Sequence, residues 1–88
     1  MAERTVTIIN KNGLHARPAA EIVKTAAKFT SDIVIVRDEL EVNGKSIMGV
    51  LMLAAECGAT VTLRASGPDD AAAVDALATL ISGRFGEK

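Results

Sequence analysis

The chain has 88 residues, of which 49% are hydrophobic, 24% charged and 2% aromatic, and its formal net charge is −1. This length predicts one domain over residues 1–88, with a modest core and no deep substrate pocket. A charge near zero without a basic block argues against direct binding to nucleic acid. The chain also lacks the Trp and Tyr on which single-stranded bases stack. The composition favours a small carrier or binding module over a self-sufficient enzyme.

The chain contains one His and one Cys. A zinc site needs three or four Cys, His or carboxylate ligands, so we expect no metal, and no cofactor is implied. Cys57 has no disulfide partner in the chain and is expected to be a small buried apolar residue in a reducing compartment. The first residues lack a signal-peptide pattern, and no apolar run approaches the roughly 20 residues that span a bilayer. We therefore expect a cytoplasmic protein with no membrane insertion.

Hydrophobic spacing and turn residues place the expected elements along the chain. Alternating or β-branched runs predict strands at residues 5–9, 32–36, 40–42 and 60–65, with a turn at 37–39. Helical spacing predicts helices at residues 16–29, at 47–55, and from the Pro68-containing segment 66–70 to about Ser82. Gly58 is expected to close the second helix in the left-handed conformation, and Gly83 to end the third. Residues 84–88 are expected to form a frayed tail.

The predicted order of elements, β-α-β-β-α-β-α, indicates an α+β fold. We expect an open-faced β-sandwich, in which one face of a four-stranded sheet carries the helices and the other meets solvent. The threonines expected on the solvent face are Thr5, Thr7, Thr60 and Thr62. The helix residues expected to be buried are Ala19, Ile22, Val23, Ala26, Ala27, Val50, Leu53, Ala54, Val74, Leu77, Ala78 and Ile81.

His15 lies where a loop becomes a helix. If His15 is the residue before the first helical turn, the amides of Ala16 and Arg17 have no partner within the helix, and Pro18 has no amide to lose. Free amides at the positive end of a helix dipole form an anion site, and the Arg17 guanidinium adds a fork suited to phosphate oxygens. A neutral imidazole is nucleophilic near neutral pH. These residues suit a phosphoryl acceptor, although a solvated surface histidine and arginine without a further role would fit them too.

The chain resembles the HPr family, the phosphocarriers of the bacterial sugar phosphotransferase system, in two places. Residues 12–20 (NGLHARPAA) resemble the family's active-site signature, and residues 44–50 (GKSIMGV) resemble its second motif. The two motifs lie at the spacing that the family shows, and the resemblance covers essentially the whole chain.

The resemblance implies how the histidine would be used. His15 would accept a phosphoryl group on Nδ1 from enzyme I, which is charged by phosphoenolpyruvate, and would pass it to the IIA domain of a sugar-specific permease. Arg17 would stabilise the phosphoryl group in both transfers, and no metal would take part. The family fold is an antiparallel sheet of strand order 1-4-2-3 under three helices. The protein would then be a relay between enzymes and not itself an enzyme.

Ser46 opens the second predicted helix, and a plain helix N-cap is the simplest interpretation, since serine is favoured there. The resemblance adds regulation: phosphorylation of Ser46 by an ATP-dependent HPr kinase/phosphorylase, with a catabolite-control transcription factor as a further partner. A phosphate adds a charge of about −1.5 to −2, which would repel an acidic partner.

The second predicted helix has more apolar residues than one face can bury. Four of them lie off its buried face: Ile47, Met48, Leu51 and Met52. An exposed patch of this composition is typical of a protein-docking surface. The alternative is a helix that is buried more deeply than the spacing indicates.

Other functions also fit parts of the sequence. A nitrogen-branch paralogue would share the histidine motif but signal to regulators instead of serving sugar transport. A small ligand-sensing or assembly module would not need His15. A metal-free hydrolase could use His15 as a base, but no partner acid or nucleophile lies near it in the sequence. A paralogue phosphorylated only on serine is disfavoured because His15 is present.

Overall fold

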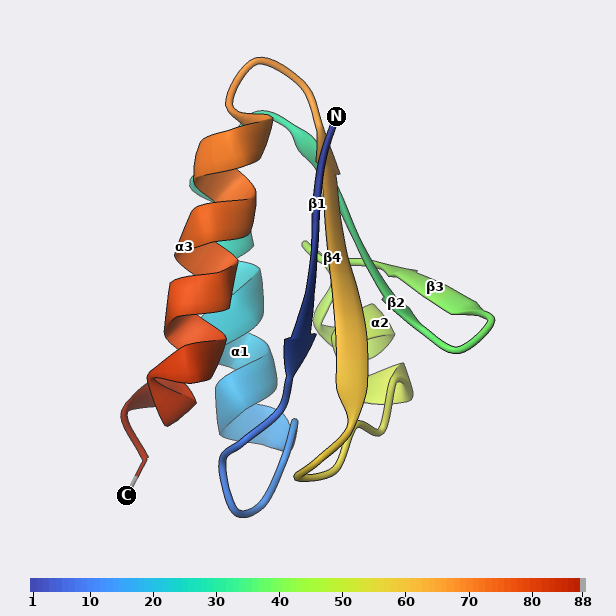
Figure 1. Ribbon diagram of the computed structural model, residues 1–88, viewed down its shortest axis with the longest axis vertical. Coiled ribbons are helices and arrows are strands. Elements are labelled where there is room, and N and C mark those ends of the chain that lie inside the picture. Colours follow the sequence, from blue (N-terminus) through green and yellow to red (C-terminus); the bar gives the residue numbers. More distant parts are fainter. Residues whose placement is uncertain (88) are drawn as a thin grey trace.

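The computed structural model describes residues 1–87 as an antiparallel sheet with helices packed on one face (Figure 1). The strands are β1 (Ala2–Thr7), β2 (Asp32–Arg37), β3 (Leu40–Asn43) and β4 (Thr60–Ser66). The helices are α1 (Ala16–Ala26), α2 (Ile47–Met52) and α3 (Asp70–Ser82), followed by a 3-10 turn η1 (Arg84–Gly86). The sheet order is β1-β4-β2-β3, with every neighbouring pair antiparallel. The predicted α+β open-faced sandwich, its element order and its strand order 1-4-2-3 are confirmed.

Side chains alternate across the sheet, as a strand with one buried face requires. Ile33 and Ile35 of β2 and Leu63 of β4 are buried in the core. Val34 and Val36, which point the other way, are half-buried. Of the threonines predicted on the solvent face, Thr62 is half-buried, and the other three are exposed: Thr5, Thr7 and Thr60. The core therefore lies between the sheet and the helices.

The helices bury most of the residues that the spacing predicted. In α3 all four predicted residues are buried: Val74, Leu77, Ala78 and Ile81. In α1, Ala19, Ile22 and Ala26 are buried and Val23 is half-buried. Ala27 was expected to be buried but is exposed, and α1 ends at Ala26 and not at residue 29, with Ala27 as its C-cap.

The second helix is shorter than predicted. It ends at Met52, and Ala54, expected on the buried face, is exposed with a left-handed φ of 48°. Gly58 has a left-handed φ of 95°, but it lies in the turn before β4 and does not close α2. There its amide donates to the carbonyl of Ile8 at 2.7 Å. The early exit from the helix places Ala55, which is 2% exposed, against the loop between β1 and α1.

Two other boundaries also differ from the prediction. Strand β1 covers residues 2–7 instead of 5–9, because it pairs with β4 from Ala2 opposite Ala65 to Thr7 opposite Thr60. Helix α3 begins at residue 70 with Asp69 as its N-cap, so Pro68 lies just outside the first turn. Gly83 is the C-cap of α3, as predicted.

The expected frayed tail and buried cysteine are both wrong. Residues 84–86 form η1, and the Phe85 side chain is 4% exposed, because burying a large aromatic side chain stabilises the docked tail. Lys88, part of the predicted tail, lies outside the described residues. Cys57 is exposed because it lies in the turn between α2 and β4, not in the core. In Figure 1 the tail, the start of α1 and the loop before it lie at the same end of the molecule.

Candidate functional site

His15 is the N-cap of α1, as the sequence predicted. Its backbone is extended (φ −82°, ψ −171°), and its carbonyl accepts the amide of Ala19 at 3.0 Å. Because helical bonding begins with Ala19, the amides of Ala16 and Arg17 have no acceptor within the helix, and Pro18 has no amide. The imidazole thus follows the loop at the positive end of the α1 dipole, next to two amides that have no acceptor within the helix.

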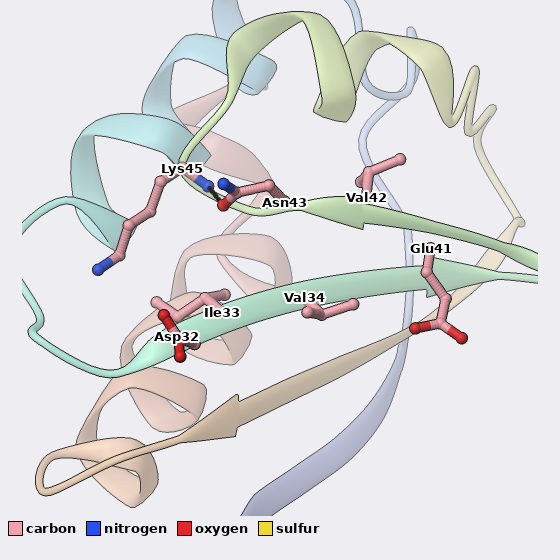
Figure 2. A pocket seen from close by; sticks show the side chains of 7 residues that line it. All are labelled: Asp32, Ile33, Val34, Glu41, Val42, Asn43 and Lys45. Carbon is pink, nitrogen blue, oxygen red and sulfur yellow. Dashed lines mark hydrogen bonds between the residues drawn. The ribbon is translucent and has the colours of Figure 1, made fainter.

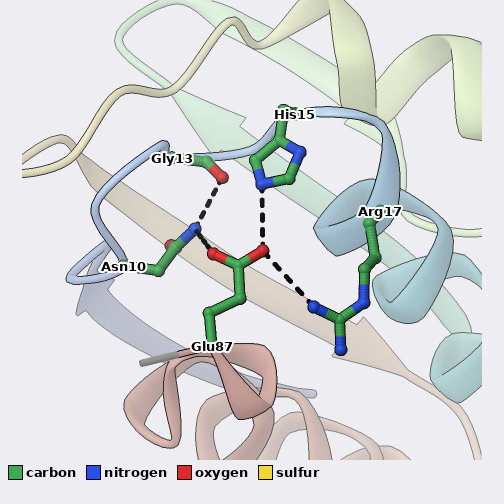
Figure 3. A network of polar contacts seen from close by, with 5 residues as sticks. All are labelled: Asn10, Gly13, His15, Arg17 and Glu87. Carbon is green, nitrogen blue, oxygen red and sulfur yellow. Dashed lines mark hydrogen bonds and ion pairs between the residues drawn. The ribbon is translucent and has the colours of Figure 1, made fainter.

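The His15 ring is tied to the C-terminal tail. Its side chain is 41% exposed, and Nε2 lies 2.9 Å from Oε2 of Glu87 (Figure 3). A carboxylate only accepts hydrogen bonds, so in the neutral ring the proton sits on Nε2 and the free electron pair on Nδ1. In Figure 3 the Nδ1 side of the ring faces the ribbon of α1. The contact therefore selects the ring nitrogen that is next to the free amides.

The Glu87 carboxylate gathers three polar side chains. They are Nδ2 of Asn10 at 3.0 Å, Nε2 of His15 at 2.9 Å and Nη1 of Arg17 at 3.8 Å. The hydrogen bond from Asn10, the one from His15 and the charges of His15 and Arg17 together hold the pKa of Glu87 below its usual range, against the opposing effect of desolvation. Glu87 is 16% exposed, whereas Arg17 is 61% exposed, so solvent and other molecules can reach its guanidinium.

Asn10 joins the loop to the tail from a buried position. It is 1% exposed, and its Nδ2 donates to the Gly13 carbonyl at 2.7 Å as well as to Glu87. Two acceptors on one side fix the orientation of the amide group. Its Oδ1 is buried and has no hydrogen-bond partner among residues 1–87. Asn10 was interpreted from the sequence only as a turn residue, and Glu87 only as part of the tail.

The loop before His15 is packed against the turn after α2. The amide of Leu14 donates to the Ala55 carbonyl at 2.8 Å. Gly13 has a φ of 65°, and a Cβ there would lie 2.4 Å from the Ala55 oxygen and 2.8 Å from the Cα of Glu56. A glycine is therefore required, both for the backbone conformation and for the close approach.

Ser46 is the N-cap of α2, as its position in the sequence indicated. Its Oγ accepts the amide of Gly49 at 3.2 Å, and its carbonyl accepts the amide of Val50 at 3.0 Å. The side chain is half-buried. The two ends of α2 thus have different contacts. Ser46 caps its start, and Ala55, which follows its end, accepts the hydrogen bond from Leu14 in the loop before His15.

The apolar residues of α2 divide between the core and the surface. Val50 and Leu53 are buried. Among the four residues expected off the buried face, Ile47, Met48 and Met52 are 39%, 66% and 63% exposed. Leu51 differs from that expectation: it is half-buried and packs against the core. The exposed apolar surface is thus made of Ile47, Met48 and Met52, and we call it the α2 patch.

A pocket lies at the other end of α1 from His15. Its lining side chains are Asp32, Ile33, Val34, Glu41, Val42, Asn43 and Lys45 (Figure 2). The ammonium of Lys45 is held by the Phe29 carbonyl at 2.7 Å, beyond the last residue of α1. The lining contains no His, Cys or Ser, so it offers no good nucleophile. We therefore take the surroundings of His15, and not this pocket, as the candidate site.

The residues around His15 limit the chemistry that the candidate site could support. Within residues 1–87, no three His, Cys, Asp or Glu side chains gather where they could hold a metal ion. The sequence showed no acid near His15, but the structure brings Glu87 to it from the far end of the chain. No residue of this network is a serine, threonine or cysteine nucleophile for the histidine to activate, so the hydrolase interpretation gains no support. No helix in the described part of the chain has both the length and the apolar character to cross a membrane.

The structure thus combines an accessible histidine at the start of a helix with an open-faced α+β sandwich. The family model described as "PTS HPr component phosphorylation site" matches residues 2–83 of the chain. The chain therefore belongs to the HPr family of the phosphotransferase system, whose members are phosphocarriers and not enzymes.

Relatives of known identity agree over nearly the full length. The phosphocarrier protein HPr of Cupriavidus necator is 53% identical over 87 residues, covering 99% of this chain and 98% of the relative. That of Treponema pallidum is 48% identical over 88 residues, with complete coverage of both. A crystal structure of HPr-C-His from Thermoanaerobacter tengcongensis superposes with a TM-score of 0.97 at 50% identity, covering 100% of this chain and 99% of the other.

Proposed function

We propose that Nδ1 of His15 accepts a phosphoryl group from enzyme I, itself charged by phosphoenolpyruvate, and passes it to IIA domains of sugar permeases. The observation that carries this proposal is the hydrogen bond from Nε2 to Glu87, which leaves the free electron pair on Nδ1, on the side of the ring toward α1, whose first amides, those of Ala16 and Arg17, have no acceptor within the helix. Family membership supports the same assignment.

The transfer needs little beyond positioning and neutralisation of charge. The Nδ1 electron pair forms a bond to phosphorus as the bond between phosphorus and the donor breaks. The proton stays on Nε2, where the Glu87 carboxylate offsets the positive charge that develops on the ring. The amides of Ala16 and Arg17 and the exposed Arg17 guanidinium would bind the phosphoryl oxygens.

The direct test is incubation with phosphoenolpyruvate and enzyme I, followed by intact-mass measurement. We expect one added phosphoryl group that is labile in acid and absent from His15→Ala. Arg17→Ala should keep the fold, since Arg17 is 61% exposed, and slow the transfer on the order of 100-fold. Arg17→Lys keeps the charge without the forked guanidinium, so its transfer rate should lie between those of the wild type and Arg17→Ala. A stoichiometric phosphate that persists in His15→Ala would remove His15 from the proposal.

The docking of partners is assigned to the α2 patch. Ile47, Met48 and Met52 expose apolar surface, while Leu51 contributes from a half-buried position. Methionine adapts to differently shaped partners, which suits a protein that must meet both a donor and an acceptor. Met48→Lys should raise the KM for charging without a change in fold. Lys28, exposed just after α1, offers a matched surface position for a Lys28→Ala control.

Regulation is assigned to Ser46, with an ATP-dependent HPr kinase/phosphorylase as the modifying enzyme and a catabolite-control transcription factor as the reader. Ser46 is half-buried at the start of the helix that carries the patch. Ser46→Asp should weaken charging, while Ser46→Asn, which keeps an N-cap without the charge, should not. Equal charging of both variants would contradict an electrostatic role.

The choice of branch is tested by the acceptor. A phosphocarrier protein NPr of Shewanella violacea is 44% identical over 85 residues, below the 53% and 48% of the HPr relatives from Cupriavidus necator and Treponema pallidum. We therefore assign the sugar branch in preference to the nitrogen-branch paralogue. Phosphotransfer to a sugar-specific IIA domain that is faster than transfer to a nitrogen-branch IIA domain is the expected result.

A further inference from the structure

The turn after α2 holds the loop that carries His15. The Leu14 amide donates to the Ala55 carbonyl at 2.8 Å, and both residues are buried. Leu14 directly precedes His15, so this bond fixes the backbone from which the imidazole projects. The approach is close, since a Cβ on Gly13 would lie 2.4 Å from the Ala55 oxygen. The position of His15 thus depends on the position of residues 53–56.

This turn is weakly held by its own backbone. Helix α2 has only six residues, and the amides of Leu53 and Ala54 bond back to Val50 and Leu51 at 3.2 and 3.1 Å, in the 3-10 manner. Ala54 has a φ of 48°, a region that residues with a Cβ rarely adopt. The last turn of α2 has no basic residue to bond its terminal carbonyls. The turn therefore needs support from another part of the fold.

Arg37, the last residue of β2, supplies that support. Its Nη1 donates to the carbonyls of Leu53 at 3.1 Å and Ala54 at 2.8 Å. Its Nη2 donates to the carboxylate of Glu56, so one planar group spans three of the four turn residues. A cation beside terminal carbonyls also complements the negative end of the α2 dipole. The sequence had predicted only a turn of the chain at residues 37–39.

We propose that Arg37 is a positioning residue for phosphoryl transfer. It holds residues 53–56 and, through the Leu14–Ala55 bond, it holds His15 in register with the first turn of α1. This inference rests on the proposed function of His15. Arg37 acts through the backbone of the turn and has no part in forming or breaking bonds.

The first arm of the test reads the loop itself. Native-state hydrogen exchange by NMR should show the Leu14 amide of Arg37→Ala exchanging roughly tenfold faster than in the wild type, since a charged group's hydrogen bonds to the turn are lost. The amide of Gly44, bonded to the Ile33 carbonyl at 2.8 Å outside this region, serves as the internal reference and should not change. Arg64→Ala is the matched control, because Arg64 also ends in ion pairs, to Glu3 and Glu41, without contacting the turn.

The second arm reads the transfer. With phosphorylated enzyme I as the donor, Arg37→Ala should lower the maximal rate of charging several-fold, Arg37→Lys should recover part of it, and Arg64→Ala should match the wild type. Lysine keeps the charge but presents a single ammonium in place of the forked guanidinium. A partial rescue would therefore show that the geometry of the Arg37 hydrogen bonds matters in addition to the charge.

The two arms keep this inference separate from the proposed function. If the wild type takes up no phosphate on His15, the proposed function fails, while the exchange arm still reports whether Arg37 holds the loop. Equal acceleration at Leu14 and Gly44 would mean a general loss of stability and would overturn the positioning role. Faster exchange at Leu14 with an unchanged transfer rate would overturn it as well, since the loop would then move without consequence for His15.

Discussion

Glu87 Oε2 accepts a hydrogen bond of 2.9 Å from His15 Nε2, although 72 residues separate the two in the sequence. The same carboxylate is bonded by the buried amide group of Asn10 on its other oxygen. The tail therefore acts on the imidazole through a single proton: by holding it on Nε2, it leaves Nδ1 unprotonated.

The first prediction concerns the tautomer of His15. In Glu87→Gln the side-chain amide can either accept from Nε2–H or donate to a bare Nε2, so the preference for the Nε2–H form should weaken. The ¹⁵N shifts of the ring nitrogens in the neutral protein measure that preference directly. Glu39→Gln, an exposed carboxylate in the β2–β3 turn, is the control and should leave the ring shifts unchanged. Identical shifts in Glu87→Gln and the wild type would show that the contact does not set the tautomer.

The second prediction concerns the docking of the tail. Phe85 is 4% exposed, so Phe85→Ala should lower the free energy of unfolding by about 3 kcal/mol, as for other buried aromatic side chains. It should also loosen Glu87, which follows it by two residues, and so shift the His15 ring resonances. Chemical denaturation and the ring spectrum measure the two effects. Leu40→Ala, at a position 39% exposed, should cost less than about 1 kcal/mol. If Phe85→Ala lowered the free energy of unfolding as little as Leu40→Ala does, Phe85 would not hold the tail, and the interpretation of residues 84–88 as a frayed tail would be correct after all.

More of the fold than of the candidate site could be predicted from the sequence. Strand alternation such as Ile33 and Ile35 against Val34 and Val36 is a local signal, so strands and helices could be placed from it. Their ends were set by partners that no local pattern reveals, as for β1, which begins at Ala2 because β4 extends to Ala65 opposite it. The end of α2 likewise depends on the contact between Ala55 and Leu14.

The site was predicted where it is local and missed where it is not. The N-cap position of His15 and the free amides after it follow from eight consecutive residues, 12–19, and could be predicted. Asn10 and Glu87 could not, since their roles come from a contact between the first loop and the docked tail. The one usable signal was Phe85, an apolar residue in a short polar tail, which indicates that the segment docks.

The third prediction compares two left-handed glycines. Gly13→Ala combines a φ of 65° with a Cβ 2.4 Å from the Ala55 oxygen, so it should lower the free energy of unfolding by at least about 3 kcal/mol and displace Leu14. Gly58→Ala has a φ of 95° but nothing within 4 Å of the new Cβ, so only the conformational cost of about 1–2 kcal/mol is expected. Thermal and denaturant unfolding of the two variants measure the difference. Equal costs would mean that the close approach of Gly13 to the α2 turn adds nothing.

The last prediction concerns the pH dependence of stability through Asp69. Its carboxylate accepts hydrogen bonds from the hydroxyl and amide of Ser31 and from the amide of Thr30, and the bond from the Ser31 hydroxyl is the largest of the causes that lower the pKa of Asp69 from 3.8 to about 2. Because the folded pKa is the lower one, the unfolded chain binds the proton first, and the stabilisation is complete above about pH 4 and is lost as the pH falls toward 2.

Asp69→Asn should therefore be less stable than the wild type at neutral pH, and the gap between them should close between about pH 4 and 2. Urea unfolding at a series of pH values measures this gap. Ser31→Ala removes the first of these bonds and should raise the pKa of Asp69, so the loss of stability should begin at a higher pH. A gap between Asp69→Asn and the wild type that stays constant down to pH 2 would show that these bonds join the α1–β2 turn to the start of α3 without favouring the charged form of Asp69.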